Sequence, residues 1–362
     1  MPQIVNSAID WLVLLAMLVV LVVIHEFGHF IVARRAGVRV HEFGIGFPPR
    51  AKVLHRGPET VFTLNWVPLG GFVKLEGEEG ESNDPRAFVN QRLRTRVVIL
   101  LAGVVMNLLL AGVLMSTIAM IGDPSTVIGV AALPATPDGS PSPAQAAGLV
   151  IGDEILSIDG QTAAWFDGPD AQLKTLRARG GQTIDLVVRH ADGSRSQVRA
   201  TLNTQAAIDA GQGALGIRFS LSAGPSITRD PITALGIGTR RTVEACTLIL
   251  VAVRDFVTDI THPQVSGPIG IVSAVGTVRA EPPVFLIYLL ALLSANLAIV
   301  NALPLPPLDG GRVAVAIIKR VAGSRLSVSA ERATYAIGFT LLMAFIVYIS
   351  IFDIARSAGG SP

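Results

Sequence analysis

The sequence predicts a multi-pass α-helical membrane protein of about four transmembrane helices, with one soluble α/β domain inserted between the second and third helices. Half of the 362 residues are hydrophobic, only 15% are charged, and the mean hydropathy is +0.55. Four nearly charge-free segments also approach the ~20 residues that cross a bilayer core. We place these spans at residues 4–24, 97–121, 284–303 and 333–352.

The charged residues around the spans predict the membrane topology. No Lys or Arg precedes the first span, and His and Glu follow where a signal peptide would be cleaved, so we expect this span to stay in the mature protein. By the positive-inside rule the basic flanks are cytoplasmic, which leaves both termini and the segment between the second and third spans outside. These basic residues are Arg34, Arg35, Arg39, Arg92, Arg94, Arg96, Arg312, Lys319, Arg320 and Arg325. The net charge of +2 gives no sign of a nucleic-acid partner, and we expect none.

The first span ends in the pattern His-Glu-Phe-Gly-His at residues 25–29. On a helix, His25 and His29 share one face with Cβ atoms roughly 5–6 Å apart, so both imidazoles can bind one Zn²⁺. Glu26 lies beside such a metal, where it can take a proton from an attacking water and pass it to a leaving amine. The pattern therefore indicates peptide-bond hydrolysis. The alternative is a helix end facing the lipid headgroups, but ionisable groups at membrane depth are costly and usually mark function.

Asp309 is the best candidate for a third ligand, because a catalytic zinc commonly has three from the protein. It follows the third span in a segment that contains Pro304, Pro306 and Pro307. These prolines end the helix, and irregular backbone at membrane depth is tolerated only where protein or a wet cavity surrounds it. Two His and one Asp suit Zn²⁺ best without excluding Fe²⁺ or Co²⁺.

Asparagines in the spans are further candidates for binding. Asn296 and Asn301, at the end of the third span, can bind the backbone of an extended substrate or a developing oxyanion. They can equally form hydrogen bonds between helices, and both interpretations stay open. Asn107, in the second span after Gly103, is expected to serve in packing and interhelical hydrogen bonding.

Residues 122–222 are expected to form the soluble domain, because apolar strands alternate there with Gly, Pro and Asp turns. Strands at 184–188 and 196–202 flank an Asp-Gly turn at 192–193. Residues 227–261 have an amphipathic pattern broken by charges, which favours an interfacial helix over a fifth crossing. Cys246, the only cysteine, excludes an intramolecular disulfide and is expected to be a packing residue.

In their order along the chain, these motifs resemble the site-2 protease family of intramembrane zinc metalloproteases, and within it the bacterial RseP type. The resemblance covers nearly the whole chain. It rests on the segments HEFGHF at 25–30, ARR at 33–35, FGIGF at 43–47, VPLGGFVK at 67–74, SGPIGI at 266–271 and NALPLPPLDGG at 301–311. Two departures are Val104, where the family often has Pro, and Pro48, where Gly is common. Neither is a candidate ligand.

The resemblance implies that His25, His29 and Asp309 hold a zinc ion and that Glu26 is the general base. It also implies that residues 61–76 form a membrane re-entrant β-loop, whose edge pairs with a substrate unwound into a strand. Unwinding is needed because a transmembrane helix hides each scissile amide in its own hydrogen bonds. The residues implied to contact substrate are Gly70, Gly71, Asn296, Asn301, Pro304 and Pro306.

Residues 146–160, AAGLVIGDEILSIDG, resemble the core of a PDZ domain. Such a domain can capture a peptide or chain end by strand addition, or it can exclude substrates with large external domains. We therefore expect one PDZ domain at 122–222, an interfacial helix and connector at 223–280, and membrane halves at 1–121 and 281–362.

The resemblance implies regulated intramembrane proteolysis: cleavage of single-span membrane substrates, such as anti-sigma factors or remnant signal peptides, after a first cut by another protease. The enzyme would lie in the cell membrane, in contact with lipid, with its active site toward the cytoplasm and its PDZ domain outside. One alternative is a noncatalytic PDZ scaffold with a structural metal, but such a zinc needs no base like Glu26. The other is a zinc transporter, which requires polar residues at several depths.

Overall fold

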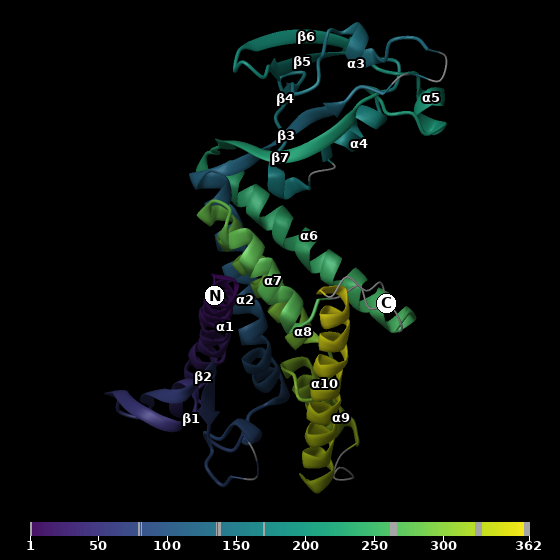
Figure 1. Cartoon of the computed structure of the whole chain (residues 1–362). Helices are drawn as coiled ribbons and strands as arrows, with labels where there is room; N and C mark the ends of the chain where they lie inside the picture. The colour runs from purple at the N-terminus through teal and green to yellow at the C-terminus, as the bar shows by residue number, and fades with distance from the viewer. Residues whose placement is uncertain are drawn as a thin grey trace. The chain divides into compact units, whose positions relative to one another are not determined.

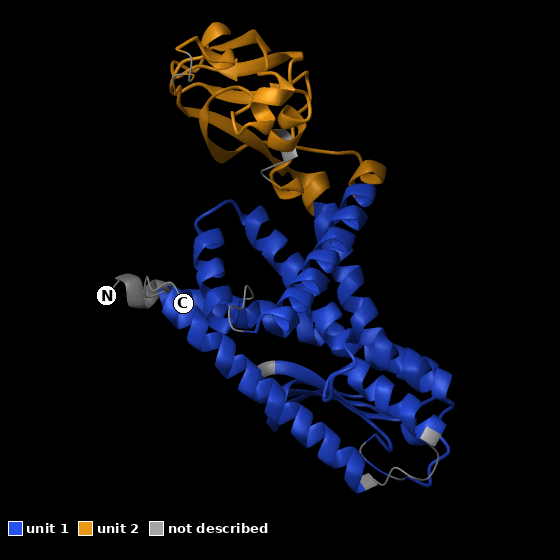
Figure 2. Cartoon of the chain, turned by 90° about the vertical axis from the view of Figure 1, so that its right-hand side faces the viewer, with its two compact units in different colours: residues 1–117, 235–362 blue, residues 118–234 orange. Residues whose placement is uncertain are grey.

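The computed structural model describes residues 2–78, 80, 82–134, 136, 139–168, 171–260, 266–322 and 328–357. The chain divides into two compact units (Figure 2). One unit, Met1–Thr117 with Leu235–Pro362, holds the long helices, and the other, Ile118–Ala234, is built around a sheet. Of the basic residues that predict the topology, Arg325 lies outside the described residues.

Within the described residues, four helices are long and apolar enough to cross a membrane, as predicted. They are α1 (Pro2–Arg35), α2 (Leu93–Ile121), α8 (Pro283–Ala302) and α10 (Val328–Ser357) (Figure 1). These helices carry apolar residues on all their faces, as is typical of membrane spans. Helix α1 continues to Arg35, beyond the predicted end of the span at residue 24, so the HEFGH segment lies within regular helix.

Helices α1 and α2 approach each other closely at Gly28. A Cβ atom at this position would lie 2.5 Å from the carbonyl oxygen of Ala102 in α2. Only glycine lacks this atom, and small residues commonly allow membrane helices to approach in this way. The close approach places one face of α2 directly against the HEFGH turn of α1.

Strands β1 (Val40–Arg56) and β2 (Val61–Leu75) pair antiparallel beside α1. Strand β2 lies within the predicted loop at 61–76, whereas β1 was not predicted as a strand. Residues 42–45 of β1 have partners on both sides, at 71–74 and at 61–64. Residues 71–75 therefore form an edge that has no further strand partner among the described residues.

Three further helices complete the first unit within its described part: α6 (Pro231–Thr258), which begins in the sheet unit, α7 (Pro268–Arg279) and α9 (Asp309–Ala322). Helix α6 covers most of the amphipathic segment predicted at 227–261. Helix α7 packs against α1, and Arg279 Nε donates to Asp10 Oδ1 over 2.8 Å. The carboxylate of Asp353 in α10 accepts from the backbone N–H of Gly270 near the start of α7, over 2.9 Å, which satisfies one otherwise unpaired donor of that helix. A short 3₁₀ helix, η1 (Phe88–Asn90), precedes α2.

The second unit contains a five-stranded antiparallel sheet, which confirms that a sheet domain is inserted between the second and third spans. The strand order is β6-β5-β4-β3-β7. These strands are β3 (Asp123–Ala132), β4 (Glu154–Ile158), β5 (Thr183–Arg189), β6 (Arg195–Thr201) and β7 (Arg218–Ile227). The short helices are α3 (Pro143–Ala146), η2 (Trp165–Asp167), α4 (Ala171–Arg177) and α5 (Gln205–Asp209).

The core of the sheet unit explains its sequence pattern. Ile128, Ile155 and Leu186 come from three neighbouring strands and are fully buried in one apolar cluster. Strands β5 and β6 pair in register around the predicted Asp-Gly turn, where Gly193 has a φ of +85°. Strand β7 pairs with β3 as far as Ile227, so sheet residues continue beyond position 222.

Candidate metal centre

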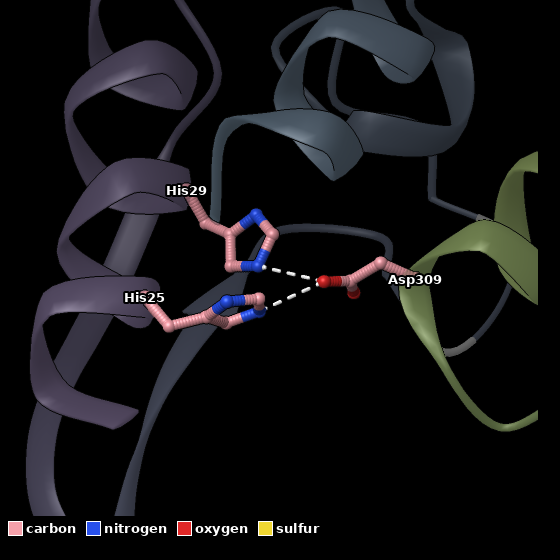
Figure 3. Close-up of side chains that lie close together, drawn as sticks. All are labelled: His25, His29 and Asp309. Carbon is pink, nitrogen blue, oxygen red and sulfur yellow. Dashed lines mark hydrogen bonds and ion pairs between the residues drawn. The ribbon is translucent and has the colours of Figure 1, made fainter. Parts of the chain in front are cut away.

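Two helices far apart in the sequence bring three side chains together at one point (Figure 3). His25 and His29 lie one turn apart on α1, and Asp309 is the first residue of α9. Oδ2 of Asp309 lies 2.8 Å from Nε2 of His25 and 3.2 Å from Nε2 of His29. Both histidines are buried, with 5% and 8% of their surface exposed.

The donor set and its spacing fit a zinc ion. Zinc ligands at about 2.0–2.2 Å in tetrahedral geometry lie roughly 3.3 Å from one another. The two distances to Asp309 are close to this value. Each of the three side chains offers one ligand atom, and these three atoms lie within 4.8 Å of one another. Two imidazoles and one carboxylate would hold the metal and leave a fourth position open, as catalytic zinc sites do.

The segment that follows α8 explains how Asp309 reaches the histidines. Helix α8 ends at Ala302 because the residue before a proline, Leu303, is disfavoured in helical conformation and is extended. The chain then turns back tightly enough that a Cβ atom at Gly310 or Gly311 would clash with the backbone of residues 302–306. The two glycines therefore permit α9 to begin at the metal centre.

One face of α2 supports the two histidines through residues spaced four apart. Nδ1 of His29 lies 2.8 Å from the carbonyl oxygen of Ile99, and Nδ1 of His25 lies 3.2 Å from the amide nitrogen of Asn107. Between them, a Cβ atom at Gly103 would lie 2.6 Å from Nε2 of both histidines. Gly103 thus leaves room for the metal. From the sequence, Asn107 was expected to serve in packing and interhelical hydrogen bonding, but His25 was not named as its partner. The four-residue spacing of Ile99, Gly103 and Asn107 was the signal available.

Glu26 is half-buried on α1 and makes no hydrogen bond to any described residue. Gly71 of β2 lies beside it, since a Cβ atom at Gly71 would be 3.7 Å from Glu26 Cγ. Gly70, with a φ of +86°, lies next to Val22 one turn earlier on α1. The structure therefore places the edge of β2 against the same part of α1 that carries the general-base candidate.

Comparison with known proteins shows the family of the chain. The model of peptidase family M50 matches residues 13–345, which is most of the chain. The chain belongs to peptidase family M50, the site-2 protease family. Membership of this family makes it a zinc metalloprotease, and with its four apolar helices it is a multi-pass membrane protein.

Similar proteins span the same length. A protein of Clostridium acetobutylicum is 31% identical over 336 residues, covering 92% of this chain and 94% of its own. A protein of Nostoc is 30% identical over 351 residues, covering 93% of each chain. A protein of Brucella suis is 29% identical, covering 94% of this chain and 93% of its own. Each is named a "putative zinc metalloprotease".

The remaining predicted site residues of this M50 protein lie on α8 and the segment after it. Asn296 is half-buried and has no hydrogen-bond partner among the described residues, and Asn301 Nδ2 donates to Leu297 O in its own helix over 3.0 Å. Pro304 is exposed, and the carbonyl of Pro306 lies against Gly338 of α10. Within the described part of the chain, no hydrogen bond or ion pair joins these four to the three metal-ligand candidates.

An ion pair outside the predicted set joins the end of β2 to α9. Arg312 lies one turn after Asp309, and its Nη2 donates to Oε1 of Glu78 over 2.6 Å. Burial lowers the pKa of the Arg312 guanidinium, but the Glu78 carboxylate outweighs it, so the pKa lies above its ordinary value. The pair connects the loop after the open strand edge to the helix that carries Asp309.

Proposed function

We propose that His25, His29 and Asp309 hold the zinc ion of this M50 protein and that Glu26 is its general base in cleaving peptide bonds within the membrane. The observation that carries this proposal is the convergence of three ligand atoms from α1 and α9, two of them on buried histidines, with Glu26 next to His25 in the same helix. A catalytic rather than a structural metal explains why only three protein ligands are gathered.

The chemistry divides between the metal and the chain. Bound zinc supplies a Lewis acid, which polarises a carbonyl and acidifies a water molecule. Glu26 takes the proton from the attacking water and delivers it to the amine of the departing chain, which is ordinary general acid–base catalysis. The Asp309 carboxylate would offset part of the metal's charge, and the two neutral histidines would orient the metal. The absence of a side chain at Gly103 leaves the space that the metal needs.

A single-span membrane helix is the substrate class that this site fits. Its scissile amide must leave the helical hydrogen bonds and find new backbone partners, because an unpaired amide in the membrane is costly. The edge of β2 at residues 71–75 offers unpaired backbone groups next to Glu26, so a substrate strand can add there. We assign Asn296, Asn301, Pro304 and Pro306 to the walls of this substrate path.

We further propose that the sheet unit is a PDZ domain outside the cell membrane and that the metal centre lies toward the cytoplasm. The basic flanks of the spans support this topology. A small, mostly apolar hollow between α4 and residues 213–217, lined by Leu173 and Leu176, supports capture of a chain end. The proposed single-span substrates include anti-sigma factors and remnant signal peptides that another protease has already cut once.

The test is cleavage of a reconstituted single-span substrate by the wild type and by Glu26→Gln, with bound zinc quantified in both. We expect Glu26→Gln to retain zinc and to lose about 10²–10⁴-fold in cleavage rate, since the base is removed without touching a ligand. Glu281→Gln, at an exposed glutamate, is the matched control and should cleave normally. Normal cleavage by a zinc-loaded Glu26→Gln would overturn the assignment.

A further inference from the structure

The side chain of Asn107 is fully buried on α2 and lies against a metal-ligand candidate. Its amide nitrogen is 3.2 Å from Nδ1 of His25, and its backbone carbonyl accepts from the hydroxyl of Ser294 in α8 over 2.8 Å. Its amide oxygen, Oδ1, is buried and has no hydrogen-bond partner among the described residues. A buried acceptor without a partner is uncommon in a native structure and calls for an explanation.

The protonation of His25 supplies that explanation. A neutral imidazole has one N–H, and in the geometry observed Nε2 donates to Asp309 over 2.8 Å while Nδ1 faces the Asn107 amide group. To ligate a metal, Nε2 must instead offer its lone pair. The proton then sits on Nδ1, which needs an acceptor. A half-turn of the Asn107 amide brings its unpaired oxygen to that nitrogen.

In His29, a backbone carbonyl supplies the acceptor that a protonated Nδ1 needs. Nδ1 of His29 lies 2.8 Å from the carbonyl oxygen of Ile99, which can only accept, so Nδ1 carries a proton. In the neutral imidazole, Nε2 then has a lone pair to offer a metal. Metal-ligating histidines usually donate their other N–H to such an acceptor, and the contact fixes the ring and its tautomer. For His25, the Asn107 amide is the only hydrogen-bond partner of Nδ1 among the described residues.

We propose that Asn107 is a positioning residue that accepts the Nδ1 proton of His25 through its amide oxygen and so holds Nε2 toward the zinc ion. The proposal rests on the proposed ligation by His25. Asn107 does not touch substrate or metal; it acts through His25. The Asn107 amide can turn either its nitrogen or its oxygen toward Nδ1 of His25. The nitrogen faces Nδ1 in the observed geometry, and the oxygen would face it in the zinc-ligating tautomer.

The experiment measures zinc affinity by chelator competition in the full-length detergent-solubilised protein. Asn107→Leu removes the acceptor, and we expect about 10–100-fold weaker zinc binding, the usual effect of losing such a partner. Asn107→Asp keeps an oxygen at the same place, and we expect affinity near that of the wild type. Ser116→Ala is the control and should bind zinc normally. Ser116 is buried on the same helix, and its hydroxyl donates to the carbonyl oxygen of Gly112 in that helix.

The rescue by Asn107→Asp separates positioning from folding, because a variant that only loses packing would not depend on an oxygen acceptor. Unchanged affinity in Asn107→Leu would overturn the proposal, as would Asn107→Asp binding as weakly as Asn107→Leu. A His25→Ala variant separates failure of the Asn107 proposal from failure of the proposed metal site. If that variant binds zinc as tightly as the wild type, His25 is not a ligand, and both proposals fail.

Discussion

At the scale of single residues, the candidate metal centre depends on the lack of a side chain at Gly103 as much as on the proposed ligands. Gly103 faces Nε2 of both histidines from α2, at a distance where no Cβ atom fits. The proposed ligands His25 and His29 are recognisable from their four-residue spacing, and Asp309 from the proline-rich break before it. Gly103 and Asn107 are not, because a lone glycine or asparagine in a span has ordinary packing roles and only the register of α1 against α2 reveals theirs.

Gly103→Ala is expected to weaken zinc binding. Its methyl group would overlap Nε2 of both proposed histidine ligands. Overpacking of this kind costs about 1–3 kcal/mol, which would appear in the free energy of zinc binding. Zinc content after dialysis against a weak chelator measures the effect. Gly112→Ala on the same helix is the control, since the nearest neighbour of its Cβ would be 3.8 Å away. Equal zinc retention in the two variants would show that α2 does not limit the site.

At the scale of elements, the hairpin and α9 are positioned together. Strand β2 was foreseen through the VPLGGFVK motif, but β1 was not, because Gly44, Gly46, Pro48 and Pro49 interrupt its alternating pattern. Its strand character comes from pairing on both sides and from packing of Phe43 against Phe30 of α1, with ring centroids 5.5 Å apart. Such partners are tertiary, so local sequence patterns do not reveal them.

Glu78→Gln is expected to destabilise the arrangement of β2 and α9. It leaves the Arg312 guanidinium, 28% exposed, without its carboxylate, and loss of a hydrogen-bonded charge partner costs about 1–3 kcal/mol. Thermal unfolding of the detergent-solubilised protein measures this. Glu244→Gln, in an exposed pair with Arg240 on α6, should change stability by less than about 0.5 kcal/mol. If both variants unfold at the same temperature, the ion pair does not join the two elements.

At the scale of the whole molecule, the chain divides into a unit of long helices and a sheet unit. Composition and apolar runs sufficed to foresee four membrane helices and an inserted sheet domain, because both signals extend over many residues. The end of the sheet unit was harder to foresee. Strand β7 continues to Ile227, past the predicted boundary, since its pairing with β3 and not its own pattern determines where it ends.

The proposed topology predicts which positions a membrane-impermeant thiol reagent can reach in intact cells. In a Cys246→Ala background, Ser194→Cys in the sheet unit should react from outside. Asn83→Cys, exposed in the loop before α2, should react only after the membrane is permeabilised. The opposite pattern would invert the topology and place the metal centre toward the outside.

The central claim is that α1 and α9 together ligate the zinc ion, and X-ray absorption at the zinc edge tests it most directly. The wild type should show one zinc ion per chain with two imidazole nitrogens and a carboxylate oxygen at about 2.0–2.2 Å. Asp309→Ala should lose the carboxylate oxygen or the metal itself. A zinc spectrum that is identical in Asp309→Ala and in the wild type would contradict the account.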